Sequence, residues 1–201
     1  MELWQYEREA QNAGYRVICG CDEAGAGPLA GPVYAAAVIL PFGVDIPGLN
    51  DSKKLTEKKR ETLFPVVKEL ASAWSVAYVD AAEIDATDIL SARMKAMQLA
   101  IDGLAQRVDF ALIDGNRDHG KTAAITTPHR CIVKGDSLSA SIAAASILAK
   151  VSRDHHMMEM AEVYPEYQFA RHKGYGTKLH YEMLREFGPS PIHRCTFLKN
   201  L

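Results

Sequence analysis

The chain has 201 residues, of which 48% are hydrophobic and 24% are charged, with a formal net charge of −2. These values are typical of a globular protein with a sizeable core, and they exclude the disordered and fibrous classes. The slightly negative total gives no overall attraction to nucleic acid, so such contacts would have to come from local groups of basic residues.

The first part of the chain is predicted to form a helix followed by two strands with no helix between them. Residues 2–13 have the amphipathic pattern of a short helix. Apolar runs at residues 15–21 and 33–40 predict two strands, and the first run leads directly into Asp22 and Glu23. Two consecutive strands of this kind predict a hairpin, which makes the sheet mixed.

Helices and strands alternate after residue 50. The capping-box spacing of Asp80 and Glu83 predicts a short helix behind a strand. The remaining predicted helices cover residues 56–71, a longer stretch marked by apolar residues from 89 to 104, 139–163 and 177–187, and the remaining predicted strands cover 74–79, 109–113 and 130–133. The pattern predicts an α/β protein with a mixed five-stranded sheet flanked by helices.

Acidic residues stand where three of the predicted strands end. Asp22 and Glu23 follow the first strand, with Gly25 two residues on, and Asp114 and Asp136 follow two later strands, each beside a glycine. Acids at the ends of strands in an open α/β sheet meet in the crevice where ligands bind, and carboxylates gathered there need cations. Oxygen ligands favour Mg²⁺ or Mn²⁺, and two such ions roughly 3.5–4 Å apart suit phosphodiester hydrolysis.

The same acids also fit a purely structural role. Asp136 stands where the N-cap of the following helix is expected, and Asp114 with Gly115 fits a turn. Pattern alone leaves both interpretations open.

Two further features are compatible with nucleic-acid binding. The turn of Gly25, Ala26 and Gly27 offers backbone N–H groups beside the first two acids, and Tyr175 stands between glycines where an aromatic ring can stack on a base or sugar. A simple turn and a core tyrosine are the alternatives.

Segments 51–60 and 171–199 are rich in basic residues, including His172, His180 and His193 in the second. They can face phosphates or form ordinary solvated helix faces.

Several classes of site and compartment are excluded or disfavoured. The sequence has no P-loop motif and no G-x-S-x-G elbow, and its histidines show no metal-ligand spacing, which predicts surface or packing roles for them. The four cysteines form no C-x-x-C pair and suit a reducing cytosol. No apolar run is long enough to span a membrane, and the first residues are charged, so we expect a cytoplasmic protein without membrane contact.

Six ordered motifs resemble those of the ribonuclease HII family of bacteria along nearly the whole chain. They are DEAGAGPLAGPV at residues 22–33, LNDSKKL at 49–55, LIDGN at 112–116, VKGD at 133–136, AASILAKV at 144–151 followed by Arg153 and Asp154, and HKGY at 172–175. Agreement by chance over six motifs in order is very improbable.

The resemblance implies a ribonuclease H-like fold with a small C-terminal helical segment. It implies a single domain over residues 1–201, in which about 165–201 form the substrate-binding segment. It further implies a monomer that acts on RNA–DNA hybrids and ribonucleotide-containing duplex DNA, as ribonucleotide excision repair and DNA replication require. Cleavage is expected on the 5′ side of a ribonucleotide, leaving 3′-hydroxyl and 5′-phosphate ends.

Matching positions carry the family's roles into this sequence. The resemblance assigns catalysis and the binding of Mg²⁺ or Mn²⁺, two ions when substrate is bound, to Asp22, Glu23, Asp114 and Asp136. It implies that Tyr175 stacks on the deoxyribose after the ribonucleotide. The other positions that it assigns to nucleic-acid binding are Gly25, Ala26, Gly27, Lys53, Lys150 and Arg153.

The sequence departs from the family at one informative position. The family usually has Gly-Arg-Gly where this chain has Gly25, Ala26 and Gly27. Backbone atoms of this turn are expected to read the ribose 2′-hydroxyl and the arginine to reach phosphate, so recognition of the junction should survive with weaker binding. The alternatives are a nucleic-acid-binding protein of the same fold with weak or altered junction specificity, a catalytically silent binding domain, and a nuclease like ribonuclease HIII, whose extra N-terminal domain has no counterpart ahead of the first strand.

Overall fold

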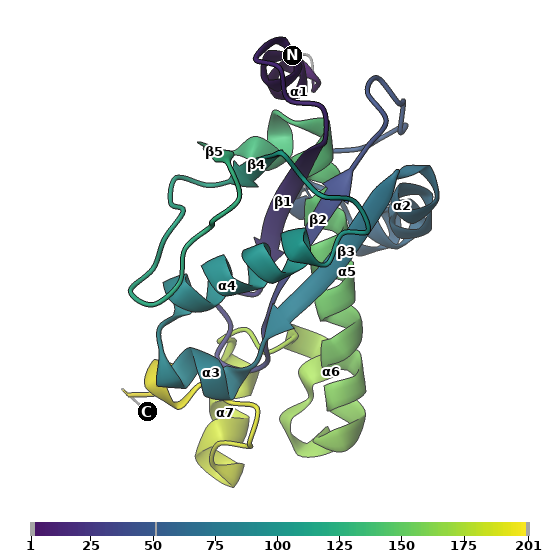
Figure 1. The fold of residues 1–201 in the computed structure, drawn as a ribbon. Helices are drawn as coiled ribbons and strands as arrows, with labels where there is room; N and C mark the ends of the chain where they lie inside the picture. The colour runs from purple at the N-terminus through teal and green to yellow at the C-terminus, as the bar shows by residue number, and fades with distance from the viewer. Residues whose placement is uncertain (1–2, 51, 200–201) are drawn as a thin grey trace.

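A computed structural model describes residues 3–50 and 52–199, and its centre is a mixed sheet of five strands (Figure 1). The strands, in chain order, are β1 (Ile18–Ala24), β2 (Val33–Ile39), β3 (Ala73–Val79), β4 (Phe110–Asp114) and β5 (His129–Ile132). Their spatial order is β3-β2-β1-β4-β5. Strand β2 is antiparallel to both β1 and β3, whereas β4 is parallel to β1 and β5. The predicted hairpin and mixed five-stranded sheet are confirmed.

Helices cover both faces of the sheet. The helices are α1 (Gln5–Asn12), α2 (Glu57–Leu70), α3 (Ala81–Ala86), α4 (Ile89–Asp102), α5 (Ala140–Val163), α6 (Phe169–His172) and α7 (Lys178–Phe187). In Figure 1, α4 lies in front of the sheet and α5 behind it. Apolar residues of α4 form one core with the first face, and those of α2 and α5 form a second core with the other. Each predicted helix is present, with ends within a few residues of the expected ones.

The long helix α5 packs directly on β1 because a glycine makes room for it. A Cβ atom at Gly20 would lie 2.2 Å from the backbone N of Ile142, a distance that no side chain tolerates. Ser139 is the N-cap of α5, and its hydroxyl accepts a hydrogen bond from the N–H of Ile142. Buried Glu7 of α1 accepts hydrogen bonds from Ser139 and Ser141, which attaches α1 to the start of α5. The fold thereby fixes α5 against the strand that carries the first two acids.

Strand β1 differs from its prediction in a way that matters for the site. It begins at Ile18 and not at residue 15, because the backbone N–H groups of Arg16 and Val17 donate to the carboxylate of Asp109. It also continues through the acids, which pair with β2 residues Ala36 and Ala35. The acids are therefore held by the ladder itself and do not sit in a loop beyond it.

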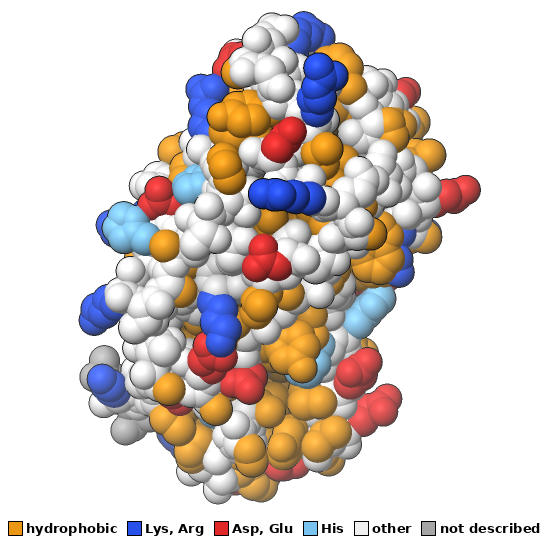
Figure 2. All heavy atoms as spheres, in the orientation of Figure 1, with side chains coloured by type: hydrophobic (Ala, Val, Ile, Leu, Met, Phe, Trp, Pro, Cys, Tyr) orange, Lys and Arg blue, Asp and Glu red, His pale blue; other side chains and the backbone are white. Residues whose placement is uncertain are grey.

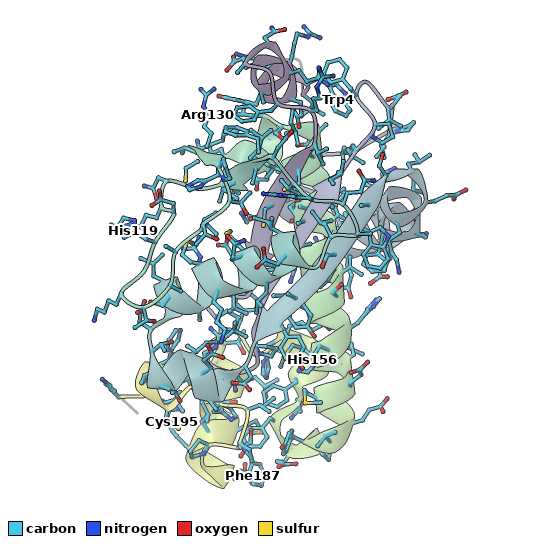
Figure 3. The ribbon with its side chains drawn as sticks, in the orientation of Figure 1. Trp4, His119, Arg130, His156, Phe187 and Cys195 are labelled. Carbon is cyan, nitrogen blue, oxygen red and sulfur yellow. The ribbon has the colours of Figure 1, made fainter. Side chains whose placement is uncertain are left out.

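The residues after α5 form a compact C-terminal segment at the end of the molecule opposite α1, with Phe187 and Cys195 in it (Figures 1 and 3). Its short 3₁₀ helices Pro165–Tyr167 and Cys195–Phe197 and the helix α6 lack the length to give a sequence signal. They pack around an apolar cluster that includes Leu29, Met157 and Phe169. This cluster connects the segment to the loop behind β1.

The surface shows no dominant field of one charge on the face drawn in Figure 2, where acidic and basic side chains are interspersed among apolar and uncharged ones. Among the helices of residues 3–50 and 52–199, none is both long and apolar enough to cross a membrane.

Candidate metal centre and nucleic-acid interface

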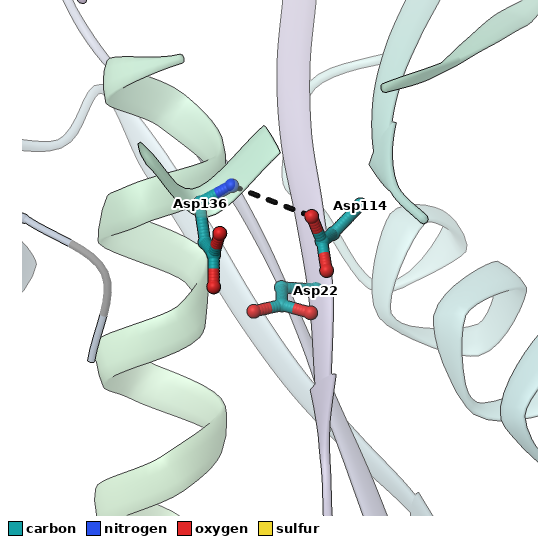
Figure 4. A group of neighbouring side chains, drawn as sticks. All are labelled: Asp22, Asp114 and Asp136. Carbon is teal, nitrogen blue, oxygen red and sulfur yellow. Dashed lines mark hydrogen bonds between the residues drawn. The ribbon is translucent and has the colours of Figure 1, made fainter. Parts of the chain in front are cut away.

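Three carboxylates meet at one edge of the sheet (Figure 4). Asp22 comes from β1, Asp114 is the last residue of β4, and Asp136 lies in a 3₁₀ helix (Gly135–Ser137) behind β5. Each offers an oxygen within 4.8 Å of those of the other two. Asp114 Oδ1 also accepts a hydrogen bond of 3.4 Å from the backbone N of Asp136. The parallel pairing of β1, β4 and β5 brings these residues to the same end of the sheet.

The interpretation of Asp136 as the N-cap of α5 is wrong. Ser139 takes that position, three residues later. Lys134, whose φ of 59° is left-handed, turns the chain after β5 and directs Asp136 toward the other two aspartates.

The electrostatics of the three carboxylates are unfavourable without a cation. Asp22 is 2% exposed and Asp136 is 3% exposed. Burial raises the pKa of Asp22 well above its ordinary value, and the nearby charges of Glu23 and Asp114 raise it further. Like charges this close cannot all ionise without compensation. The group thus favours a positive ligand.

Lys53 supplies part of that positive charge. Its Nζ lies 3.3 Å from Oδ2 of Asp136. Partial burial acts to lower the pKa of Lys53, but the carboxylates of Asp22 and Asp136 raise it by more, so it lies above the ordinary value. The structure therefore places Lys53, a predicted site residue, beside the carboxylates in its protonated form.

Glu23 lies beside the group of three and is turned toward the opposite face of the sheet. Its Oε1 forms an ion pair of 2.6 Å with Arg93 of α4. Its Oε2 is buried and, within the described part of the chain, has no hydrogen-bond partner. Burial raises the pKa of Glu23, against the lowering effect of Arg93. The structure brings together three of the four predicted acids and leaves the fourth adjacent, with one oxygen unused.

These residues fit a hard divalent cation. The donor set consists of carboxylate oxygens, which Mg²⁺ and Mn²⁺ prefer, and it contains no thiolate or imidazole. Glu23, next to Asp22 in β1, keeps one buried carboxylate oxygen without a hydrogen-bond partner among the described residues. Asp22, Asp114 and Asp136 are therefore the residues able to hold such an ion.

The turn after β1 is held by a buried arginine that no sequence motif marks. Arg194 is fully buried, and its Nη1 and Nη2 donate hydrogen bonds of 3.0 and 2.7 Å to the carbonyl oxygens of Ala26 and Gly25. It also donates to the carbonyl oxygen of Gly31 through Nε and Nη2. Burial and the charge of Arg153 lower the pKa of Arg194 to about 9. The guanidinium fixes which way the peptide groups of the turn face.

Arg153 is a second buried arginine under the same loop. Its guanidinium donates to the carbonyl oxygens of Pro32, Ala30 and Lys173 at 3.0–3.2 Å. A Cβ atom at Gly25, where φ is +94°, would lie 2.0 Å from Nε of Arg153, so only glycine fits there. Arg153 was predicted among the nucleic-acid-binding residues, and the structure places it beneath the surface.

Tyr175 is an exposed aromatic residue beside Arg153. The residue is 41% exposed, and the centroid of its ring lies 5.6 Å from both Lys150 Nζ and Arg153 Cζ. Lys150 also forms an ion pair of 2.6 Å with Asp154 one turn later on α5. The core-tyrosine interpretation is therefore wrong, because Tyr175 is exposed and its ring lies beside two cationic side chains.

Comparisons with known proteins agree on one family. A family profile described as ribonuclease HII matches residues 19–200. Among curated relatives, the ribonuclease HII of Acetivibrio thermocellus is 52% identical over 200 residues, which cover 100% of this chain and 77% of the relative. That of Geobacter sulfurreducens is 50% identical over 195 residues, covering 97% of this chain and 88% of the relative.

Solved structures show the same fold at lower identity. The ribonuclease H2 of Pyrococcus horikoshii matches with a TM-score of 0.72 and 24% identity, over 90% of this chain and 93% of that one. A ribonuclease HIII determined in complex with Mn²⁺ matches with a TM-score of 0.58 and 20% identity, over 89% of this chain and 65% of that one. These likenesses confirm the predicted ribonuclease H-like fold.

Proposed function

This chain belongs to the ribonuclease HII family, and on that premise we propose that it hydrolyses the phosphodiester on the 5′ side of ribonucleotides, both in RNA–DNA hybrids and at single ribonucleotides within duplex DNA, leaving 3′-hydroxyl and 5′-phosphate ends. Membership makes the chain a hydrolytic endonuclease of the ribonuclease H type that depends on divalent metal ions and acts on RNA–DNA substrates. The position of the cut and the single-ribonucleotide substrate are the proposal.

The meeting of three carboxylates within 4.8 Å carries the proposal. Asp22, Asp114 and Asp136 would hold the metal, with the unpartnered Oε2 of Glu23 available as a further ligand. Two Mg²⁺ or Mn²⁺ ions would supply an activated water and stabilise the leaving oxygen. Lys53, beside Asp136, would stand where a phosphate approaches the carboxylates.

The turn after β1 would read the ribonucleotide through its backbone. The carbonyl groups of Gly25 and Ala26 point at Arg194, and a peptide N–H points away from the carbonyl of the same peptide unit. The N–H groups of Ala26 and Gly27 therefore face away from Arg194, and Gly27 is exposed. They are the donors we assign to the ribose 2′-hydroxyl, a contact that needs no arginine at position 26.

The exposed ring of Tyr175 would stack on the sugar after the ribonucleotide, with Lys150 beside it near a phosphate. Arg153 would act from below, by holding the loop and the ring, and would not touch phosphate. We further propose that the protein acts as a monomer.

The test is cleavage of a duplex that contains one ribonucleotide, with Mg²⁺ or Mn²⁺ and with a chelator, followed by analysis of the product ends. We expect metal-dependent cutting directly 5′ of the ribonucleotide. An all-DNA duplex of the same sequence is the matched control and should stay intact. Binding without cleavage at any metal concentration would favour the catalytically silent alternative, and cutting of both duplexes would remove the assigned junction specificity.

A further inference from the structure

The C-terminal segment holds a buried row of imidazoles directly beneath the turn of Tyr175. His180 is 0% exposed, His193 is 2% exposed and His172 is 7% exposed. The ring of His180 stacks on that of His172, with centroids 4.3 Å apart and planes 20° apart. This row is part of neither the carboxylate group nor the arginine-held loop.

Hydrogen bonds join two of these imidazoles into a chain that ends on Tyr175. Nδ1 of His180 lies 3.0 Å from the carbonyl oxygen of Tyr175, and Nε2 of His180 lies 2.9 Å from Nε2 of His193. Nδ1 of His193 accepts from the backbone N–H of Ser190 at 2.9 Å and lies 2.8 Å from the serine hydroxyl. Every polar atom of both rings thus has a partner.

The partners at the two ends decide where each proton lies. A carbonyl oxygen only accepts, so His180 must donate through Nδ1–H. Because one ring nitrogen of a neutral imidazole carries the proton, Nε2 of His180 is then an acceptor and His193 must donate through Nε2–H. This leaves Nδ1 of His193 as an acceptor, as the N–H of Ser190 requires. One arrangement of protons satisfies the whole chain.

The surroundings keep both rings neutral. Burial lowers the pKa of His180 to about 4, and the same cause, with the neighbouring His180, lowers that of His193 to about 4. A further proton on Nε2 of His180 would face the Nε2–H of His193, and a further proton on Nδ1 of His193 would face the backbone N–H of Ser190. At neutral pH the hydrogen bonds among His180, His193 and Ser190 therefore keep the same donors and acceptors.

We propose that His180 is the positioning residue for Tyr175, and that His193 and Ser190 hold it in the tautomer whose Nδ1–H binds the Tyr175 carbonyl. The inference rests on the proposed stacking role of Tyr175. Apart from His180, the backbone of Tyr175 is tied by its N–H to the carbonyl oxygen of His172 and by its carbonyl oxygen to the N–H of Thr177. Both are bonds within the turn of residues 172–177, whereas the bond from His180 connects that turn to helix α7.

Positioning of the backbone matters for Tyr175 because its ring is exposed to solvent. A stacking residue contributes most when its backbone is already held in the productive geometry, since less freedom is lost on binding. Tyr175 is 41% exposed and its ring lies beside Lys150 and Arg153, so the orientation of the ring depends on where the turn sits. Buried His180 sets that position without touching the substrate.

The first experiment uses the unaltered protein. Nitrogen-15 NMR of the imidazoles, at neutral pH, distinguishes the protonated from the unprotonated ring nitrogen. We expect His180 to carry its proton on Nδ1 and His193 on Nε2. Observation of the Nε2–H tautomer for His180 would overturn the proposal whatever any variant does.

The second experiment is a double-mutant cycle of His180→Phe with Tyr175→Ala, measured as KM and kcat on a duplex with one ribonucleotide. Phenylalanine keeps the ring that stacks on His172 and removes both hydrogen bonds. We expect His180→Phe to raise KM roughly threefold to tenfold, the range for one neutral hydrogen bond, and to change kcat less. In the Tyr175→Ala background the same substitution should have little further effect, because the ring it positions is gone.

His180→Asn is the matched conservative variant, since its amide nitrogen takes the place of Nδ1 and keeps the donor to Tyr175. It should retain most of the affinity that His180→Phe loses. An equal loss from His180→Phe in both backgrounds would show a general structural role and overturn the proposal. A normal KM for a folded His180→Phe, with Tyr175→Ala impaired, would overturn it while the proposed function stands. No effect of Tyr175→Ala would instead remove the stacking role itself.

Discussion

The carboxylate edge (Asp22, Glu23, Asp114 and Asp136) and the arginine-held turn (residues 25–32 with Arg153 and Arg194) both bury charge, and they compensate it in opposite ways. In the turn, buried guanidinium groups are satisfied within the chain by carbonyl oxygens, through hydrogen bonds of 2.7–3.2 Å. At the edge, like charges face one another and the protein supplies Lys53 and Arg93 as partial compensation.

The difference separates a region built to be stable alone from one built to receive a ligand. A buried charge is costly unless it is paired and hydrogen-bonded. The turn meets that condition and can present its N–H groups in a fixed direction. The carboxylate edge meets that condition only when a cation binds. Removing one carboxylate charge should therefore stabilise the edge, whereas removing one guanidinium should destabilise the turn.

The largest expected effect is on activity, at the edge. Asp22→Asn or Asp136→Asn should reduce cleavage of a single-ribonucleotide duplex by more than ~100-fold, the cost of removing one preorganised electrostatic group. The free energy of unfolding in the absence of metal should stay equal or rise, because repulsion is removed. Initial rates and urea unfolding measure the two effects. Asp45→Asn, at an exposed acid, is the control. Robust cleavage by both site variants would refute the metal assignment.

The opposite result is expected from the turn. Arg194→Met removes the donor to three carbonyl oxygens and should lower the free energy of unfolding by about 3 kcal/mol or more, since each hydrogen bond to a charged group contributes about 1.5–3 kcal/mol. Urea denaturation measures it. Arg185→Met, at an exposed arginine of α7, is the matched control and should change little. A stable Arg194→Met protein would show that the turn is not held from below.

The sequence predicted these two regions unequally. The acids of the carboxylate edge stand in or directly behind short apolar strands, so local pattern located all four, and the structure gathers Asp22, Asp114 and Asp136. Arg194 has its partners 163–169 residues away along the chain, and in the sequence it is one basic residue of a basic tail. Such a residue acquires its role only from the tertiary fold.

The roles of the buried histidines likewise come from the tertiary fold. Surface or packing roles were predicted for them without distinction. The structure shows that His180 and His193 are buried, so the alternative that this stretch faces phosphates is wrong for both. Their hydrogen bonds join residues five and thirteen positions apart, across the turn before α7 and the irregular residues 188–193 after it, and neither stretch has a periodic signal. The single domain with a substrate-binding segment over about 165–201 stays a prediction.

Replacing Ala26 by the arginine that is usual in the family tests whether this part of the turn can contact phosphate. Ala26→Arg should tighten binding to a single-ribonucleotide duplex by roughly 1.5–3 kcal/mol, as for one hydrogen bond to a charged group. It should steepen the salt dependence of log K by about 0.9 for each phosphate newly neutralised. Binding of metal-free protein across a salt series measures both, with the all-DNA duplex as the matched control substrate. Unchanged affinity and slope would show that position 26 reaches no phosphate.

The smallest effect is expected at Tyr175, which belongs to neither region and lies over Arg153. Tyr175→Ala should weaken binding by about 1–3 kcal/mol, the contribution of one stacked ring, whereas Tyr175→Phe should be mild. Binding isotherms on the same duplex measure both. Equal losses from the two substitutions would point to the hydroxyl group and exclude stacking as the role of this ring.

Titration with a divalent cation tests directly whether the cation binds the carboxylate edge and stabilises the folded protein. The urea-unfolding midpoint of the full chain is measured as Mn²⁺ is added, for the unaltered protein and for Asp22→Asn. A ligand that binds only the folded state raises stability with the logarithm of its concentration above Kd. We expect the midpoint of Asp22→Asn to be equal or higher without metal and to stay there, while the midpoint of the unaltered protein rises with Mn²⁺. An equal rise in both proteins, or none in the unaltered one, would contradict this expectation.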